Sequence, residues 1–321
     1  MNKNVSMKDI ALALHISVDG VSKALRDSPE ISEATKQRVR EKAKELGYVK
    51  NSLAVSLKMG TSNTVAVFMN GFFNPYFAIL CDKIIRELAK AGYNGMVSAI
   101  PGYRLTMDSI RTVFSNKCSA VISLTEPDDD VVQALVANKI PVFLIGIKPK
   151  SPMIHYIITD DYNGGKKVGE YFLSHPYQSC IYITDSPSET STRRLAGFKG
   201  AAEKKEGARF YSVPFEEDKD TVEEACRMIV ENKIEFAFCF SDYLALSLRV
   251  QLRRKYHIDN IMIFGFDNIT ESLRIYEPIN SVATDTDSIV REVVSDLDAV
   301  KQKTDLEKGY GKVYPVKLAI Y

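Results

Sequence analysis

Apolar residues recur at helical spacing through the first fifty residues of the chain. The pattern predicts three short helices, one through Ile10, Ala11 and Leu14, one over Val18 to Leu25 and one over Glu33 to Leu46. A serine that can cap the helix precedes each of them: Ser6, Ser17 and Ser32. Because the turn at 14–16 is tight, the first two helices form a helix-turn-helix.

The outer face of the second helix carries side chains suited to DNA. Lys23 can donate to guanine O6 and N7 in the major groove, and Ser17, Ser22 and the helix N-terminus can bind phosphate. A three-helix unit that serves only for packing is the alternative. The predicted DNA contacts in this part of the chain are Ser6, Ser17, Val18, Asp19, Ser22 and Lys23.

A short amphipathic segment follows, with Asn51 as a further helix cap. A helix of eight residues is too short to be stable alone in water, so this one needs a partner helix or DNA. Ala54 would let two copies approach closely, Leu57 could wedge between base steps from the minor groove, and Lys58 could meet phosphate. We predict a headpiece at 1–50, a hinge at 51–62 and a core at 63–321.

The remaining residues alternate between short apolar runs and helical patterns, which predicts an α/β core of two lobes with parallel sheets. The predicted strands are Val65–Met69, Met96–Ile100, Ala120–Leu124, Pro141–Ile145, Cys180–Thr184, Phe236–Phe240 and Met262–Phe266. Ligands of such sheets bind beyond the carboxyl ends of the strands, so we expect a ligand in a cleft between the lobes.

Side chains that follow the predicted strands are candidates for that ligand site: Phe73, Tyr76, Phe77, Asp160, Arg194, Ser241, Asp242 and Asp267. The aromatic residues could equally be helix-packing core, and Asp160 and Asp242 could cap the helices that follow them. Arg194 and Asp267 are stronger candidates, because a buried guanidinium and a buried carboxylate both require polar partners.

Composition and charge narrow the class of protein. With 45% hydrophobic residues, and neither a signal-peptide pattern nor a long apolar run, we expect a soluble, cytoplasmic protein. The five cysteines and four histidines show no metal-binding spacing, so we predict no metal and no cofactor. The net charge of +1 divides into +4 for residues 1–60 and −3 for the rest, which is typical of a segment that contacts phosphate.

The first sixty residues resemble the headpiece and hinge of the LacI/GalR family of bacterial repressors. The resemblance lies in the runs M-K-D-I-A-L-A-L-H-I-S-V-D-G-V-S-K-A-L, I-S-E-A-T-K-Q-R-V and E-L-G-Y-x-x-N-S-L-A-V-S-L. It implies that Val18 and Asp19 occupy the main base-reading positions, that Lys23 takes a position often held by Arg or His, and that Leu57 matches an intercalating leucine.

The core resembles the effector-binding domain of the same family, through N-P-Y-F at 74–77, T-D-D-Y-N-G-G at 159–165, R-L-A-G-F at 194–198, S-D-Y-L-A at 241–245 and F-G-F-D-N at 264–268. This implies that Arg194 and Asp267 hold ligand hydroxyls or a purine, that Phe238 stacks on a ring, and that Tyr76 and Phe77 line the cleft. The chain departs from the family at Gly146 and Ile147, where an Asp is usual, and at Ser241, where Asn is frequent.

The sequence lacks the motifs of common enzyme classes, including G-x-S-x-G, a phosphate loop and H-E-x-x-H, so we predict that it is not an enzyme. A solute-binding receptor would share the core but needs a signal peptide. We therefore predict a transcription regulator, most simply a repressor, that binds a palindromic operator as a homodimer. A small molecule such as a sugar would control it, and control by a protein partner is the alternative.

Overall fold

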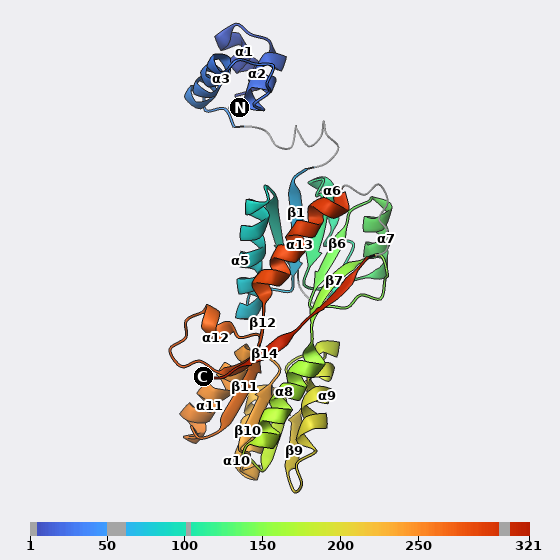
Figure 1. Cartoon of the computed structure of the whole chain (residues 1–321), viewed down its shortest axis with the longest axis vertical. Coiled ribbons are helices and arrows are strands. Elements are labelled where there is room, and N and C mark those ends of the chain that lie inside the picture. The colour runs from blue at the N-terminus through green and yellow to red at the C-terminus, as the bar shows by residue number, and fades with distance from the viewer. Residues whose placement is uncertain (1–4, 50–61, 101–103, 302–308) are drawn as a thin grey trace. The chain divides into compact units, whose positions relative to one another are not determined.

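A computed structural model of the chain describes residues 5–49, 62–100, 104–301 and 309–321. The chain forms two compact units, Met1–Ser62 and Asn63–Tyr321 (Figure 1). The described part of the first unit, residues 5–49, is called the headpiece below, and the second unit is called the core.

The headpiece contains the three predicted helices: α1 (Met7–Leu14), α2 (Val18–Leu25) and α3 (Glu33–Glu45). Ile10, Val21 and Val39, one from each helix, are fully buried against one another and form the centre of its small core. Gly47 follows α3 with a φ of 66°, the left-handed conformation that commonly ends a helix. The sequence prediction for these helices is confirmed.

The core consists of two lobes, each built on a six-stranded sheet (Figure 1). The first sheet has the order β13-β7-β6-β4-β1-β2 and the second the order β14-β12-β11-β10-β8-β9. All neighbouring strands in both sheets are parallel except β12 and β14. The expected two-lobed α/β fold with parallel sheets is confirmed.

The strands of the first sheet are β1 (Thr64–Met69), β2 (Asn94–Ala99), β4 (Ala120–Ser123), β6 (Val142–Ile145), β7 (His155–Thr159) and β13 (Gly311–Tyr314). Those of the second are β8 (Ser179–Ile183), β9 (Arg209–Val213), β10 (Phe236–Cys239), β11 (Met262–Phe266), β12 (Asn280–Thr284) and β14 (Val316–Ala319). A third, two-stranded sheet pairs β3 (Arg104–Leu105) with β5 (Glu126–Pro127).

Helices cover both faces of each sheet because alternate strand residues point to opposite sides. In the first lobe, Val65 and Val67 pack toward α5 (Pro75–Lys90) and α13 (Thr286–Lys301), whereas Ala66 and Phe68 pack toward α6 (Arg111–Ser115) and α7 (Asp129–Ala137). The second lobe has α8 (Asp161–Ser174) and α9 (Glu189–Ala202) on one face. On the other face lie α10 (Thr221–Asn232) and α11 (Asp242–Tyr256), with the short α12 (Ile269–Ser272) following β11.

The chain passes between the lobes three times, from β7 into α8, from β12 into α13 and from β13 to β14. Helix α8 therefore starts where the chain enters the second lobe. Segments that follow β7, β8, β10 and β11 meet at the same edge of that lobe. Within the described residues, no helix is long and apolar enough to cross a membrane, and no group of His, Cys, Asp or Glu residues is arranged to hold a metal ion.

Candidate functional site

Two serines fix the start of the helices in the helix-turn-helix. The backbone amide and the hydroxyl of Ser6 both donate to Asp9 Oδ2 at 2.7 Å, and Ser17 Oγ accepts the amide of Gly20 at 2.9 Å. A Cβ atom on Gly20 would lie only 3.2 Å from Ser17 Oγ, so the glycine leaves room for this cap. Because the cap sets the first residue of α2, it also sets which side chains the outer face presents.

The outer face of α2 carries the predicted base-reading side chains. Val21 and Ala24 are fully buried on the inner face, while Val18 is 40% exposed and Asp19 is also exposed. Ser22 and Lys23 are half-buried beside them. The structure thus brings these residues together on one side of α2, with Ser17 at its start.

Lys23 is held by two carboxylates. Its Nζ lies 2.6 Å from Glu30 Oε2 and 3.3 Å from Asp19 Oδ2. The hydrogen bonds and charges of Glu30 and then Asp19 raise the pKa of Lys23 above its ordinary value. The amine that could read a base therefore already has partners in the free protein.

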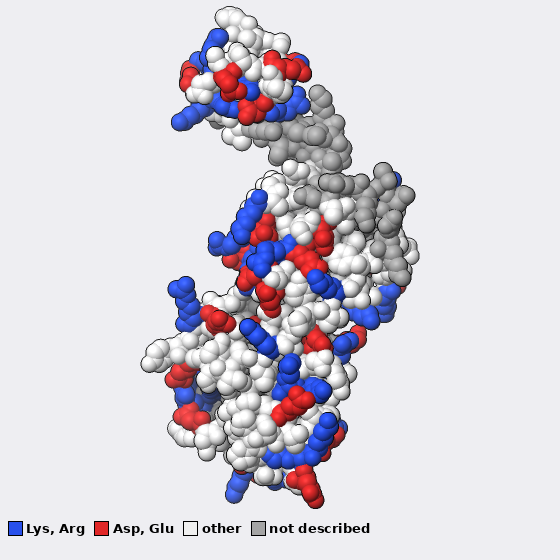
Figure 2. Space-filling view, viewed as in Figure 1, with Lys and Arg blue, Asp and Glu red and all other residues white. Residues whose placement is uncertain are grey.

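The net charge of +4 counted for residues 1–60 does not lie within the described headpiece. Residues 5–49 contain eight Lys and Arg against seven Asp and Glu, a net charge of +1. Lys3, Lys50 and Lys58 make up the difference and lie outside the described residues, as do the predicted hinge contacts Asn51, Ala54 and Leu57. Figure 2 shows acidic and basic side chains interleaved on the visible face of the headpiece.

In the core, Arg194 on the first turns of α9 is the centre of a buried polar cluster. Its Nε donates to Asp161 Oδ1 at 2.9 Å and its Nη1 donates to the carbonyl oxygen of Phe240 at 2.6 Å. The guanidinium carbon lies 3.4 Å from the centre of the Phe266 ring. Burial alone would lower the pKa of Arg194, but Asp161 and Asp267 outweigh it and raise the pKa. Arg194 is therefore a fixed, charged group.

Glycines bring α8 and α9 close enough to place Arg194 beside Asp161. A Cβ atom on Gly165 would lie 2.0 Å from the carbonyl oxygen of Arg194, and one on Gly197 would lie 2.0 Å from that of Tyr162. The two helix backbones are thus in direct contact. Asp161 begins α8, and Thr159 Oγ1 donates to its Oδ1 at 3.0 Å, which completes the support for the ion pair.

Asp267 follows β11 in an unusual backbone conformation, with a φ of 95°. Such a conformation in a residue other than glycine is often found at functional sites. Its Oδ1 lies 3.8 Å from Arg194 Nη2, too far for a hydrogen bond. Burial raises the pKa of Asp267 to about 6, while Arg194 lowers it and Asp161 adds to the rise. A partly free carboxylate of this kind is suited to accept ligand hydroxyl groups.

Asp242 and Ser241 make hydrogen bonds that fix the segments around the Arg194 cluster. Asp242 is fully buried, and its two carboxylate oxygens accept the amide of Ile269 at 2.8 Å and the hydroxyl of Ser281 at 2.6 Å. Ser241 Oγ accepts the amide of Leu244 at 3.2 Å and caps α11. The fold thus uses Asp242 to anchor the segment after β11 and Ser241 to cap α11, and contact of either residue with the ligand stays a prediction.

Asp160 also has a local role. Its Oδ1 accepts the amide of Asn163 at 3.3 Å and its Oδ2 accepts the Asn163 side-chain amide at 2.6 Å, so it caps α8. The alternative noted from the sequence, a helix cap, accounts for Asp160. The neighbouring Asp161 turns toward Arg194 instead.

Phe238, predicted to stack on a ligand, has its ring in the core of the second lobe, and the stacking stays a prediction. It is fully buried on the α8–α9 face of the second sheet, with Phe198 and Tyr182 as ring neighbours at 5.2 and 5.4 Å between centroids. The rings beside Arg194 are those of Phe266 and Phe240, at 3.4 and 4.8 Å from its guanidinium carbon. Sequence reasoning missed both.

The first lobe contributes Tyr76 to this junction. Burial raises the pKa of the Tyr76 phenol, Asp267 and Asp161 raise it further, and Arg194 lowers it, so the phenol lies within the field of the second-lobe cluster. Tyr76 and Phe77 both pack against the core of the first lobe, with their ring centroids 5.4 Å apart. Phe73 is 96% exposed. Of the three predicted aromatic residues, Tyr76 is the one whose phenol is influenced by the charges of the cluster.

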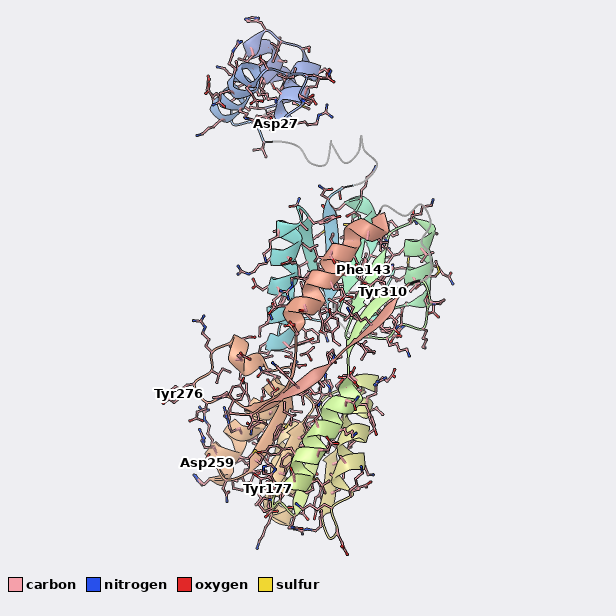
Figure 3. All side chains as sticks on the ribbon, viewed as in Figure 1. Asp27, Phe143, Tyr177, Asp259, Tyr276 and Tyr310 are labelled. Carbon is pink, nitrogen blue, oxygen red and sulfur yellow. The ribbon has the colours of Figure 1, made fainter. Side chains whose placement is uncertain are left out.

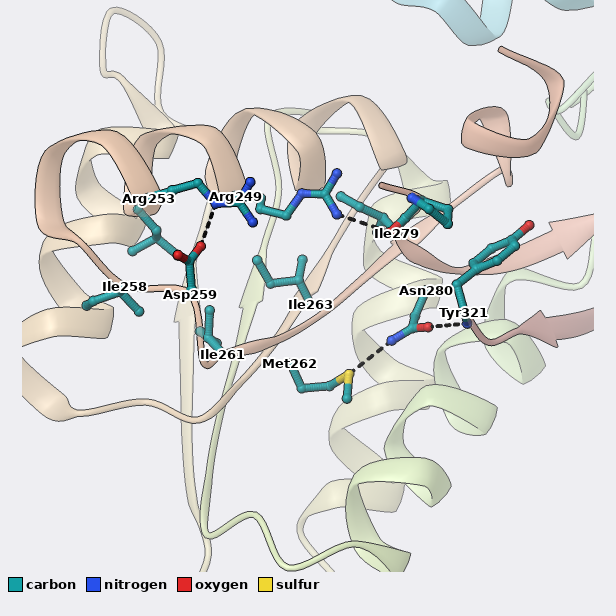
Figure 4. A pocket seen from close by; sticks show the side chains of 12 residues that line it. Arg249, Arg253, Ile258, Asp259, Ile261, Met262, Ile263, Ile279, Asn280 and Tyr321 are labelled. Carbon is teal, nitrogen blue, oxygen red and sulfur yellow. Dashed lines mark hydrogen bonds and ion pairs between the residues drawn. The ribbon is translucent and has the colours of Figure 1, made fainter. Parts of the chain in front are cut away.

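A separate hollow of about 270 Å³ lies at the amino ends of β11 and β12, the opposite edge of the second sheet (Figure 4). Arg249 Nη1 donates to the carbonyl oxygen of Pro278 at 3.0 Å, and Arg253 forms ion pairs with Asp259 at 2.5 Å and Glu277 at 2.9 Å. Because both guanidinium groups are engaged within the chain, this hollow is distinct in position and chemistry from the Arg194 cluster.

A helix-turn-helix headpiece and a two-lobed core with a polar cluster at the lobe junction define the class of protein as a regulator with a ligand-binding domain. Residues 6–51 match the bacterial regulatory proteins of the lacI family. Residues 62–232 match the periplasmic binding proteins and sugar binding domain of the LacI family. The chain therefore belongs to the lacI family of bacterial regulatory proteins, and it is a ligand-regulated, DNA-binding transcription regulator.

Individual proteins agree with this assignment. The chain is 26% identical over 305 residues to the probable HTH-type transcriptional repressor ExuR of Bacillus subtilis (strain 168), covering 89% of this chain and 88% of ExuR. The lac repressor dimer bound to operator and the anti-inducer ONPF matches with a TM-score of 0.81 at 17% identity, covering 99% of this chain and 98% of that one. A LacI family regulator from Enterococcus faecium with bound ribose matches with a TM-score of 0.70 at 20% identity, covering 80% and 97%.

Proposed function

We propose that the protein is a repressor that binds an approximately palindromic operator as a homodimer and responds to a small polyhydroxy ligand at the lobe junction. The cluster of Asp161, Arg194 and Asp267, with Tyr76 from the other lobe in its field, carries the proposal. A ligand held by Asp267 and Tyr76 contacts both lobes. Its binding therefore shifts the equilibrium between arrangements of the lobes.

The chemistry of the cluster favours a ligand with hydroxyl donors. Asp267 has a carboxylate that Arg194 reaches only at 3.8 Å, and buried carboxylates need hydrogen-bond donors. Phe240 and Phe266 supply apolar surface beside it. Gly146 brings no carboxylate from the first lobe, so the second lobe provides the acceptors in this proposal.

For the DNA half, we propose that α2 lies in the major groove with Val18, Asp19 and Lys23 toward the bases. Ser6, Ser17 and Ser22 would face the phosphates, and Leu57 and Lys58 would contact the operator centre. The support is that the described residues of this set lie together on the solvent-facing side of α2 and at the N-caps of α1 and α2. Two copies on a two-fold axis require an operator with matching half-sites.

A selection of bound sequences from a random DNA pool, using the full-length protein, tests this proposal. We expect the enriched sequences to share an approximate palindrome. Enrichment of a single, unrepeated half-site would contradict the dimeric mode, and absence of any enrichment with or without sugars would contradict operator binding under sugar control.

Exposed apolar side chains on the second lobe support the homodimer. Tyr243 and Val250, seven residues apart on the solvent-facing side of α11, are 42% and 46% exposed. Leu273 is 45% exposed and Tyr276 is 98% exposed in the segment after α12, where Figure 3 shows Tyr276 projecting outward. Exposed aromatic and aliphatic side chains are typical of protein interfaces, and we propose a second copy of this chain as the partner.

Replacing Tyr276 with aspartate is expected to shift the protein toward monomers. An exposed aromatic anchor commonly contributes about 2 kcal/mol or more to an interface, so the dimer dissociation constant should rise at least about thirtyfold. Sedimentation equilibrium measures this constant. Tyr162→Asp, at another exposed tyrosine (46%) on α8, is the matched control and should leave it unchanged. Equal constants for wild type and Tyr276→Asp would contradict the proposed interface.

Asp267→Asn is expected to remove a pH-dependent loss of stability. Because the pKa of Asp267 is raised to about 6, the folded state favours the protonated form, and this contribution is lost as the pH rises from the ordinary value of 3.8 through about 6. Over that range the free energy of unfolding of the wild type should fall relative to Asp267→Asn, by up to about 1.4 kcal/mol per pH unit. Urea titrations between pH 4 and 7 measure it; parallel profiles would contradict the assignment.

A further inference from the structure

We propose that Glu30 is a specificity-determining positioning residue of the DNA-recognition surface, acting through Lys23. The proposal rests on the DNA-reading role of α2 proposed above and adds a residue that lies outside that helix. Its carboxylate competes with DNA for the Lys23 amine, so that Lys23 leaves it only for a strong acceptor.

The geometry places Glu30 directly on the amine. Glu30 Oε2 lies 2.6 Å from Lys23 Nζ, closer than Asp19 Oδ2 at 3.3 Å. Glu30 stands in the loop between α2 and α3, where its own amide donates to Ser28 Oγ at 3.4 Å. The amide of Ile31 donates to the carbonyl oxygen of Ser28 at 3.3 Å. This turn holds the carboxylate over the second half of α2.

The same loop neutralises other basic side chains of the headpiece. Asp27, labelled in Figure 3, pairs with Arg40 at 2.8 Å and with Lys36 at 3.3 Å. Residues 5–49 contain seven acidic side chains against eight basic ones, so their net charge is only +1. This part of the headpiece therefore adds little to the non-specific attraction to phosphate, and contacts to bases have more weight in what it contributes.

The Lys23–Glu30 ion pair is weak enough for a strong hydrogen-bond acceptor on DNA to break it. Lys23 is 35% and Glu30 is 64% exposed at the side chain, so solvent screens the ion pair and keeps it weak. Guanine offers lysine two acceptors, O6 and N7, whereas adenine and thymine each offer one and cytosine offers none. Guanine can therefore displace Glu30, whereas a base with one acceptor or none leaves Lys23 on Glu30.

Asp19 sharpens the preferred base pair. It lies one helical turn before Lys23, and its carboxylate can accept a hydrogen bond from cytosine N4. A G·C pair within reach of both side chains offers the acceptor to Lys23 and the donor to Asp19. Where no such pair is present, Lys23 stays on Glu30, and the Asp19 carboxylate lies close to DNA without a cytosine amine to donate to it.

The test measures the DNA dissociation constants of the full-length wild type and the full-length Glu30→Gln variant. The first DNA is the operator selected from the random pool. The others are copies of it in which each base pair of one half-site is substituted in turn. The variant should bind every sequence more tightly, because it has lost a negative charge near phosphate. It should also gain about two- to fivefold in discrimination at the pair that Lys23 reads, because only the complex with guanine has to break the Lys23–Glu30 ion pair.

Glu45→Gln is the matched control. It removes the same charge from the same unit, and Glu45 also pairs with a lysine, Lys42, at 2.5 Å on α3. It should raise the affinity for all sequences equally and keep the discrimination of the wild type. An equal gain of discrimination in Glu45→Gln and Glu30→Gln would overturn the proposal, since a general change in charge would then explain both. Unchanged or lower discrimination in Glu30→Gln would overturn it as well.

Lys23→Ala separates this proposal from the one on which it rests. Lys23→Ala alone should lose discrimination at one base pair, and adding Glu30→Gln to it should change that discrimination no further. A change of discrimination in the double variant relative to Lys23→Ala would overturn the role of Glu30 but leave the reading by Lys23 intact. Unchanged discrimination in Lys23→Ala would overturn both, because no base would then be read by that side chain.

Discussion

Replacing Arg194 with alanine is expected to lower the free energy of unfolding of the core by about 3–5 kcal/mol, because a buried charge cluster loses its only cation among the described contacts. The variant leaves the Asp161 carboxylate without the guanidinium at 2.9 Å and the Phe240 carbonyl oxygen without its donor. It also removes the planar group that covers the Phe266 ring. Few single changes in the core disturb so many buried contacts.

Urea denaturation at neutral pH measures this effect. Lys199→Ala on the same helix is the matched control: its side chain is half exposed, its ion pair with Glu203 spans 3.6 Å, and its loss should change the free energy of unfolding by less than about 0.5 kcal/mol. If Arg194→Ala and Lys199→Ala unfold at the same urea concentration, the cluster does not hold the second lobe together.

Gly197→Ala is expected to destabilise the second lobe by at least about 3 kcal/mol, because the added methyl group would meet backbone atoms of α8 rather than a side chain that can move. The nearest atom, the carbonyl oxygen of Tyr162, is 2.0 Å from the Cβ position, and the amide nitrogen of Lys166 is 2.7 Å away. Relief requires α8 and α9 to separate. Since Asp161 and Arg194 sit on these two helices, the variant should also weaken the response to ligand.

Gly200→Ala provides the control for this prediction. Gly200 is one turn further along α9, and a Cβ atom there has no neighbour within 4 Å. Alanine is the better helix former by about 1 kcal/mol, so this variant should become more stable. Opposite shifts in thermal unfolding for the two variants are the expected result. Equal shifts would show that helix propensity, and not the contact between α8 and α9, decides the outcome.

Local signals in the sequence were sufficient for the headpiece. Ser17 and Ser32 cap the helices predicted for them, and Gly47 ends the third. These features depend on residues a few positions apart, so the chain sequence contains them directly. The hinge lies outside the described residues, and its role stays a prediction.

The core could be predicted less completely because its missed strands carry polar residues for tertiary reasons. In β12, Ser281 is fully buried yet hydrogen-bonded to Asp242, a partner 39 residues away. In β7, His155 is buried with its ring stacked 4.8 Å from that of Phe143. An edge strand such as β9 exposes Arg209 and Ser212. None of these residues produces the apolar run by which the other strands were predicted.

Sequence patterns were also insufficient to identify the individual residues of the Arg194 cluster. Whether Asp160 or Asp161 faces Arg194 depends on which of them begins α8, and only the folded helix decides this. Whether Phe238 or Phe240 lies near Arg194 depends on the strand register in the second sheet, in which Phe238 pairs with Phe264 and Tyr182. The sequence pointed to the segments that form the Arg194 cluster, and the tertiary fold selected the residue within each.

The affinity of the full-length protein for its selected operator, measured with and without each member of a panel of sugars, tests the central claim most directly. We predict that at least one sugar changes the operator Kd of the wild type about tenfold or more, within the usual range of allosteric coupling. The same sugar should change the Kd of Asp267→Asn less than about twofold, with operator affinity in its absence unaltered. A wild type that responds to no sugar, or an Asp267→Asn variant that responds as fully as the wild type, would contradict control through this cluster.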